Sequence, residues 1–118
     1  MRMRTKGAKI VVPEGNAIFV FVLPIPSELD EIHDKYTTHV DKDGEDGEDV
    51  TDNRAVIEEL WCNHLTSWNG VEDGDGVPID CGIETRVATW MADPSVCIGI
   101  VTRAFEMAKN REDLAEKN

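Results

Sequence analysis

Residues 8–23, AKIVVPEGNAIFVFVL, decide how the fold begins. Two runs rich in β-branched and aromatic residues, 8–12 and 17–23, flank a segment that contains Pro13 and Gly15. Pro pre-sets a turn dihedral and Gly tolerates backbone conformations that other residues resist, so this segment is typical of a turn. The pattern therefore predicts a β-hairpin at the start of the chain.

The second run of this hairpin is apolar on both faces. Successive side chains of a strand point to opposite faces, so Ile18, Val20 and Val22 share one face. The other face carries Phe19, Phe21 and Leu23. Later helices are expected to cover one of these faces, and the other is either covered by the remaining helices or forms an interface with another chain, such as a second copy.

Helical spacing of apolar residues, capping residues and Gly or Pro stops predict four helices after the hairpin. These span about 27–37, 53–69, 83–91 and 94–110. Thr51 or Asp52 is the predicted cap of the second, and Asp93-Pro94 begins the fourth. In the third helix, the apolar residues are expected to share one packed face: Ile83, Val87, Trp90 and Met91. The predicted class is α+β, an N-terminal β-hairpin followed by about four α-helices in one domain, 1–118.

Three polar segments are expected to be flexible. Residues 1–7 form a basic arm, residues 110–118 form a polar C-terminal tail, and residues 41–52 hold seven acids and one Lys with two Gly. The last composition buries too little apolar area to offset the entropy of ordering, which predicts a mobile acidic loop.

The charge balance limits the partners of the chain. With 12 Lys and Arg against 24 Asp and Glu, the formal net charge is −12, which repels phosphates and anionic lipids. We therefore expect neither nucleic-acid nor membrane binding. The longest apolar run, 17–25, is shorter than the roughly 20 residues that cross a bilayer, and no leader pattern opens the chain. Three cysteines without a Cys-x-x-Cys pair favour a reducing compartment, so we expect a cytoplasmic protein.

Chemistry-bearing motifs are weak. The alternating acids from Asp41 suggest a calcium loop, but its sixth and twelfth positions are Asp46 and Asp52 where an EF-hand needs Gly and Glu. Cys62 and His64 point about 200° apart on a helix, which disfavours a shared zinc ion. No activating motif surrounds a cysteine, and no phosphate-binding loop or nucleophile elbow is present. We expect no catalytic residues, metal or cofactor, and no enzyme activity.

Large apolar side chains are the candidates for partner binding, because aromatic residues dominate interface hot spots. The candidates are Phe19, Phe21 and Leu23 on one hairpin face, and Trp61 and Trp68 on a helix. The alternative role for each is a place in the core.

The second half of the chain resembles a known family. Residues 57–65, IEELWCNHL, precede 66–79, TSWNGVEDGDGVPI, in which Trp-x-Gly-Val, an acidic Gly turn and Gly-x-Pro-Ile follow in order. Together with the helix that begins at Asp93-Pro94 and a terminal Lys117-Asn118, this order resembles the small tail assembly chaperones of long-tailed phages. The acidic insert 41–52 departs from that pattern.

The resemblance implies a non-enzymatic function. Members of this family bind the long, apolar tape measure protein, keep it soluble while the tail tube polymerises, and leave before the virion matures. The expected partners are therefore the tape measure protein and the tail tube protein, and the expected location is the host cytoplasm. Separately, the hairpin has no obvious third strand in the sequence, so an alternative architecture pairs it across a homo-oligomer. No catalytic residues are carried over.

Two alternatives of other classes stay open. An acidic DNA mimic would occupy the basic groove of a nucleic-acid enzyme, and its binding would weaken steeply with salt, whereas apolar client binding would persist. A calcium-binding module is the other alternative.

Overall fold

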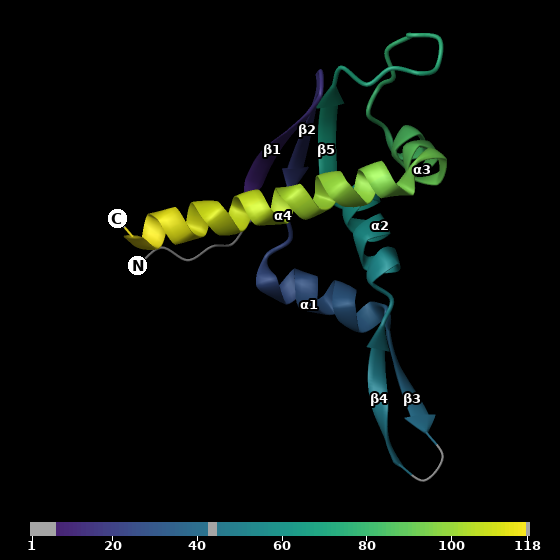
Figure 1. Ribbon diagram of the computed structural model, residues 1–118, viewed down its shortest axis with the longest axis vertical. Coiled ribbons are helices and arrows are strands. Elements are labelled where there is room, and N and C mark those ends of the chain that lie inside the picture. Colours follow the sequence, from purple (N-terminus) through teal and green to yellow (C-terminus); the bar gives the residue numbers. More distant parts are fainter. Residues whose placement is uncertain (1–6, 43–44, 118) are drawn as a thin grey trace.

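The structure is a computed structural model that describes residues 7–42 and 45–117, with the backbone alone for 42, 45–46 and 112–117. Its elements are β1 (Lys9–Glu14), β2 (Ala17–Val22), α1 (Pro26–Lys35), β3 (Thr37–Lys42), β4 (Glu45–Thr51), α2 (Asn53–His64), β5 (Leu65–Asn69), α3 (Ile83–Ala92) and α4 (Pro94–Lys117). The chain begins with an antiparallel hairpin and continues with helices, which confirms the predicted α+β class (Figure 1).

The first hairpin becomes part of a three-stranded antiparallel sheet in the order β1-β2-β5. Its turn uses Gly15 at a φ of 57°, a left-handed conformation that Gly adopts without steric cost. Val12 pairs with Phe19 and Ile10 pairs with Phe21 across β1 and β2. The strand β5 differs from the prediction, which continued the second helix through these residues.

The inner face of the sheet forms the core. Phe21 and Val12 are completely buried, and Phe19 and Leu23 are nearly so. The helices α2 and α4 lie across this face, as Figure 1 shows, and bury Leu60 from α2 and the α4 residues Ile100, Val101 and Ala104 against it. We call the side of the sheet that carries Phe19, Phe21 and Leu23 the Phe face. It packs against the helices because its larger side chains remove more apolar area from water than Val20 and Val22 on the opposite face would.

The outer face of the sheet is open. Val11, Ile18 and Val22 are 47%, 43% and 38% exposed, and within residues 7–42 and 45–117 no helix covers them. The hairpin thus presents one buried and one exposed apolar face, so the described helices do not cover both faces.

The helix α1 is attached to α2 by polar contacts. Lys35 Nζ lies 2.6 Å from Glu59 Oε1, and the Tyr36 hydroxyl donates to the same oxygen at 3.1 Å. The hydrogen bond and the charge of Glu59 raise the pKa of Lys35. The helix α2 is capped by Asp52, whose Oδ1 accepts from the amide of Ala55 at 3.1 Å, as one of the two predicted caps.

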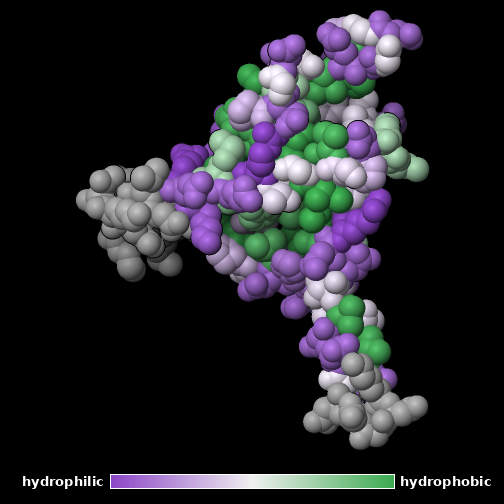
Figure 2. Space-filling model, in the orientation of Figure 1, coloured by the Kyte–Doolittle hydropathy of each residue, from purple (hydrophilic) through white to green (hydrophobic). Residues whose placement is uncertain are grey.

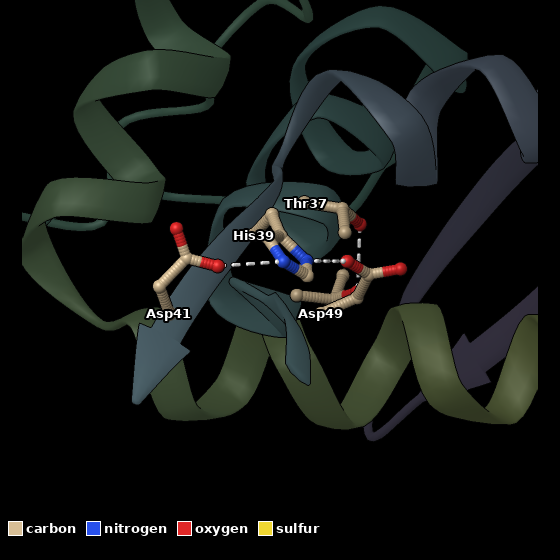
Figure 3. A network of polar contacts seen from close by, with 5 residues as sticks. Thr37, His39, Asp41 and Asp49 are labelled. Atoms are coloured by element: carbon tan, nitrogen blue, oxygen red, sulfur yellow. Dashed lines mark hydrogen bonds and ion pairs between the residues drawn. The ribbon is translucent and has the colours of Figure 1, made fainter. Parts of the chain in front are cut away.

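The acidic segment differs from the expected loop. β4 pairs with β3 in a two-stranded arm that projects away from the body (Figure 1). At the arm, His39 lies between two carboxylates, with Nδ1 2.9 Å from Asp49 and Nε2 3.0 Å from Asp41 (Figure 3). A neutral imidazole has a single N–H, so both contacts are hydrogen bonds together only when the ring is protonated on both nitrogens. Cross-strand pairing of this kind orders residues that composition alone assigns to a loop.

The helix α3 occupies the predicted range with a different orientation. Trp90 is buried, but Ile83, Val87 and Met91 are 52%, 38% and 76% exposed. Arg86 takes the inward position instead, because its Nη1 donates to the carbonyl of Leu65 at 2.8 Å. Of the four residues predicted to share a packed face, only Trp90 is therefore packed inward.

The molecule is elongated. Its Cα radius of gyration is 16.9 Å and its extents are 57 × 42 × 21 Å, whereas a compact chain of this length has a radius of about 13–14 Å. The arm and the far end of α4 account for the difference (Figure 1). Among the described helices, none combines the length and apolarity required of a membrane span. The basic arm 1–7 lies outside the described residues except for Gly7, and α4 continues through the predicted tail to Lys117.

Candidate functional site

An aromatic recess lies between the sheet, α2 and the start of α4. We define this aromatic recess by Phe19, Trp61, Trp68, Val96 and Ile100, which line a cavity of about 310 Å³. The residues come from β2, α2, β5 and α4, so the recess exists only in the folded chain. Figure 2 shows apolar residues gathered on both sides of α4 on this face of the molecule.

Three rings form the floor and wall of the recess. The Trp61 ring lies 5.6 Å from Phe19 and 6.3 Å from Trp68, between ring centroids. Phe19 meets Trp68 edge-on at 6.2 Å. Tilted and edge-on arrangements at these distances are the favoured geometries of aromatic pairs. The cluster therefore holds its shape without a ligand.

Hydrogen bonds fix the two indoles. Trp61 Nε1 donates to the carbonyl of Arg86 at 2.9 Å and lies 3.2 Å from Thr89 Oγ1, which links α2 to α3. Trp68 Nε1 donates to the carbonyl of Ile79 at 2.7 Å, which links β5 to the connector before α3. Each indole N–H is thus satisfied, and the half-buried Trp68 keeps apolar ring area at the surface of the recess, whereas Trp61 is buried beneath it.

The mouth of the recess combines apolar and acidic groups. Val96 is 47% exposed there, and Val71 is half-buried. Glu72 and Asp93 also line the recess, and both are exposed. The recess is therefore suited to an apolar side chain of another molecule whose neighbouring residues are uncharged or basic. An acidic neighbour would be buried unpaired beside the carboxylates of Glu72 and Asp93, which is costly.

Cys97 lies on the wall of the recess and is buried. Burial, with a smaller contribution from Asp93, raises its thiol pKa to about 12. Burial also raises the pKa of Cys62, which is half-buried on α2. Since the thiolate is the nucleophile, neither thiol is activated in this fold.

We expect Cys97 to resist alkylation in the folded protein. At pH 8, a thiol of this pKa is ionised in about one molecule in 10,000, so iodoacetamide should label Cys97 only after guanidinium unfolds the chain, as peptide mass spectrometry would show. Stability should also fall as pH rises from the ordinary thiol pKa toward about 12, because only the unfolded thiol ionises in that window. Rapid native labelling of Cys97 would contradict its burial.

The structure places the five partner-binding candidates in or beside the core. Phe21, Trp61, Leu23 and Phe19 are at most 6% exposed, and Trp68 is half-buried. It brings Phe19, Trp61 and Trp68 together in the aromatic recess, whereas Phe21 and Leu23 lie outside that cavity. Their burial supports the core role that the sequence left as the alternative for each.

The sequence analysis did not assign Val96 to a site. The apolar spacing of the last predicted helix favours a packed position for Val96, but Val96 lies in the first turn of α4 and is 47% exposed. The available signal was an apolar residue two positions after Pro94, in the first turn of the predicted helix.

A second apolar cavity lies on the other side of α4. The α1–α4 groove, as we define it, has Leu29, Ile57 and Phe105 on its walls and Val56, Leu60 and Val101 at its floor. Its volume is about 360 Å³, and an adjoining cavity of about 280 Å³ shares Leu29 and Phe105 and reaches Lys109. Both cavities are lined chiefly by aliphatic and aromatic side chains.

Within the part of the chain that the structure describes, no three His, Cys, Asp or Glu residues are grouped to hold a metal ion. Comparison with protein-family models, curated proteins and solved structures finds no match to the chain.

Proposed function

We propose that this protein is a non-enzymatic phage tail assembly chaperone that binds the tape measure protein and keeps it soluble during tail assembly. The observation that carries the proposal is the aromatic recess, an apolar cavity with two tryptophans that opens at the surface of a strongly acidic chain. The motif order of residues 57–79 supports the same function by resemblance.

The recess fits a client by a simple mechanism. Tryptophan-lined pockets provide much of the binding energy in protein interfaces, since their rings bury large area at low entropic cost. An apolar side chain of a client helix would enter between Trp68 and Val96, and the net charge of −12 would then make the complex more soluble. Binding of this type needs no reactive group.

The test is Val96→Asp. This substitution places a carboxylate at the mouth of the recess, and it should weaken client capture by about tenfold or more. An acid in the first turn of a helix interacts favourably with the helix dipole, so α4 should remain folded. The measurement is co-purification of the tagged chain with the tape measure protein of the parent genome, at high salt.

The matched control is Val77→Asp, at an exposed position in the connector before α3. It changes the net charge equally and should leave client capture unchanged. Equal capture by Val96→Asp and the native chain would refute the recess as the client site, and no tape measure protein in the native sample would refute the chaperone function.

One specific observation favours the DNA-mimic alternative. Asp41 and Asp49 lie on the paired strands of the arm, which fixes their spacing better than the expected loop would. Under this alternative a nucleic-acid enzyme would co-purify in place of the tape measure protein and would be released by salt. The same purification therefore separates the two functions.

A further inference from the structure

The mouth of the aromatic recess carries negative charge that nothing balances. Glu72, in the connector after β5, and Asp93, directly before α4, both line the cavity, and none of the described residues that line it is Lys, Arg or His. Elsewhere, Glu59 on α2 is paired with Lys35. Within the described part of the chain, neither Glu72 nor Asp93 has such an ion pair. Two carboxylates therefore lie beside an apolar cavity without a cation.

Of these two carboxylates, that of Glu72 is the more available. Asp93 is partly occupied, because its Oδ1 accepts from the amide of Val96 at 3.4 Å, and the positive end of the α4 dipole lies at the same place. The Glu72 carboxylate accepts no hydrogen bond from the described residues. Its backbone is nevertheless fixed, because Val71 and Asp73 on either side of it hydrogen-bond across the connector, each at 2.9 Å. Glu72 thus has a fixed position and a free charge.

The ring of Trp68 strengthens the preference of this mouth for a cation. Trp68 lines the same cavity as Glu72, and its half-buried ring is held by the hydrogen bond from Nε1 to the carbonyl of Ile79 at 2.7 Å. The face of an aromatic ring carries negative charge density and attracts ammonium and guanidinium groups, and tryptophan does so most strongly. A cation at the mouth therefore meets favourable groups in both the ring and the carboxylate, whereas an acid is repelled by both.

We propose that the aromatic recess selects an apolar side chain with a Lys or Arg beside it, and that Glu72 is the residue that pairs with this cation. The inference rests on the proposed function, in which the recess receives the client, and it names the class of client segment. On a client helix, residues four apart share one face, with about 5–6 Å between their Cβ atoms. A basic residue one turn from the apolar anchor therefore lies at the mouth while the anchor lies inside.

The experiment compares two small probes that differ in charge. The probes are phenylbutylammonium and its uncharged analogue phenylbutanol, whose ring represents the apolar anchor. Each is titrated into the full chain at about 0.15 M salt, where the Debye length is about 8 Å. The NMR signals of the Trp68 indole N–H and the Val96 amide then give the dissociation constant of each probe.

Two variants locate the charge that matters. Glu72→Gln removes the proposed partner of the cation with little change in shape. Asp75→Asn, at an exposed position in the same connector and outside the recess, is the matched control. Both variants reduce the general attraction of the acidic chain for cations by the same single charge.

The native chain and Asp75→Asn should bind the ammonium probe about fivefold more tightly than the alcohol, as one exposed ion pair beside a ring face provides. Glu72→Gln should bind both probes equally, with the affinity of the native chain for the alcohol. The proposal is overturned if the native chain binds both probes equally or neither. A preference that survives Glu72→Gln, or that is lost equally in Asp75→Asn, overturns it as well.

Failure of this inference is distinct from failure of the proposed function. If the tape measure protein co-purifies with the native chain but the two probes bind equally, the recess takes an apolar anchor alone and the chaperone function stands. If no tape measure protein co-purifies, the chaperone function fails, and the probes still decide whether the recess prefers a cation.

Discussion

Phe21→Asp should unfold the protein. The Phe21 side chain has no exposed area, and its ring lies 6.3 Å from that of Trp61. Removing a buried phenylalanine costs about 3–5 kcal/mol, and a carboxylate without a partner in the same position costs several more. Because the whole stability of a domain is about 5–15 kcal/mol, the folded state should be lost, as far-UV circular dichroism and urea denaturation would show.

The control for this prediction is Val11→Asp. Val11 is on the neighbouring strand, faces the opposite side of the sheet and is 47% exposed. A carboxylate there stays in water, so stability should change by about 0.5–1 kcal/mol at most. If Phe21→Asp instead kept a cooperative transition and lost only association, the Phe face would be an interface and not the core.

The elements with a strong local signal were predictable from the sequence. Three local patterns produce the structure that they predict. They are the β-branched and aromatic run 17–23, the turn at Pro13 and Gly15, and the helix start at Asp93-Pro94. In these segments the spacing of apolar residues, the turn residues and the capping residues favour the same structure. Local signals of this kind do not depend on distant partners.

The strand β5 was not predictable in the same way. Leu65 and Trp68 continue the helical spacing of α2, so the sequence predicts helix across them. In the fold, Leu65 pairs with Phe21 and Trp68 with Phe19, along an edge of β2 that β1 leaves open. Pairing with that edge satisfies the backbone, buries Leu65 and half-buries Trp68, which outweighs the local helical preference.

The aromatic recess was predictable only in part. The sequence identified Trp61 and Trp68 as binding candidates and Phe19 as a hairpin residue, but it placed the tryptophans on one helix. Their meeting depends on the β2–β5 pairing, which brings residues about 50 positions apart into one wall. The inward position of Arg86, which leaves Ile83, Val87 and Met91 exposed, likewise depends on a distant carbonyl, that of Leu65.

Trp61→Ala should have the second largest effect on stability. Trp61 is 2% exposed and contacts the rings of Phe19, Phe21 and Trp68, so it joins α2 to β2 and β5. Its removal should cost about 3–5 kcal/mol, measured as the shift in free energy of unfolding in urea. Trp68→Ala is the comparison. It should lower the free energy of unfolding by less, because Trp68 is only half-buried in the folded protein.

Trp61→Phe separates ring packing from hydrogen bonding. It keeps most of the apolar contact but removes the indole N–H bond to the carbonyl of Arg86. Because that carbonyl still accepts from the Thr89 hydroxyl, the cost should be about 0.5–1.5 kcal/mol. Since that bond links α2 to α3, the variant should remain folded while amide exchange in α3 becomes faster. A cost for Trp61→Ala no greater than that for Trp68→Ala would contradict the central place of Trp61, and unchanged α3 exchange in Trp61→Phe would contradict the link between the two helices.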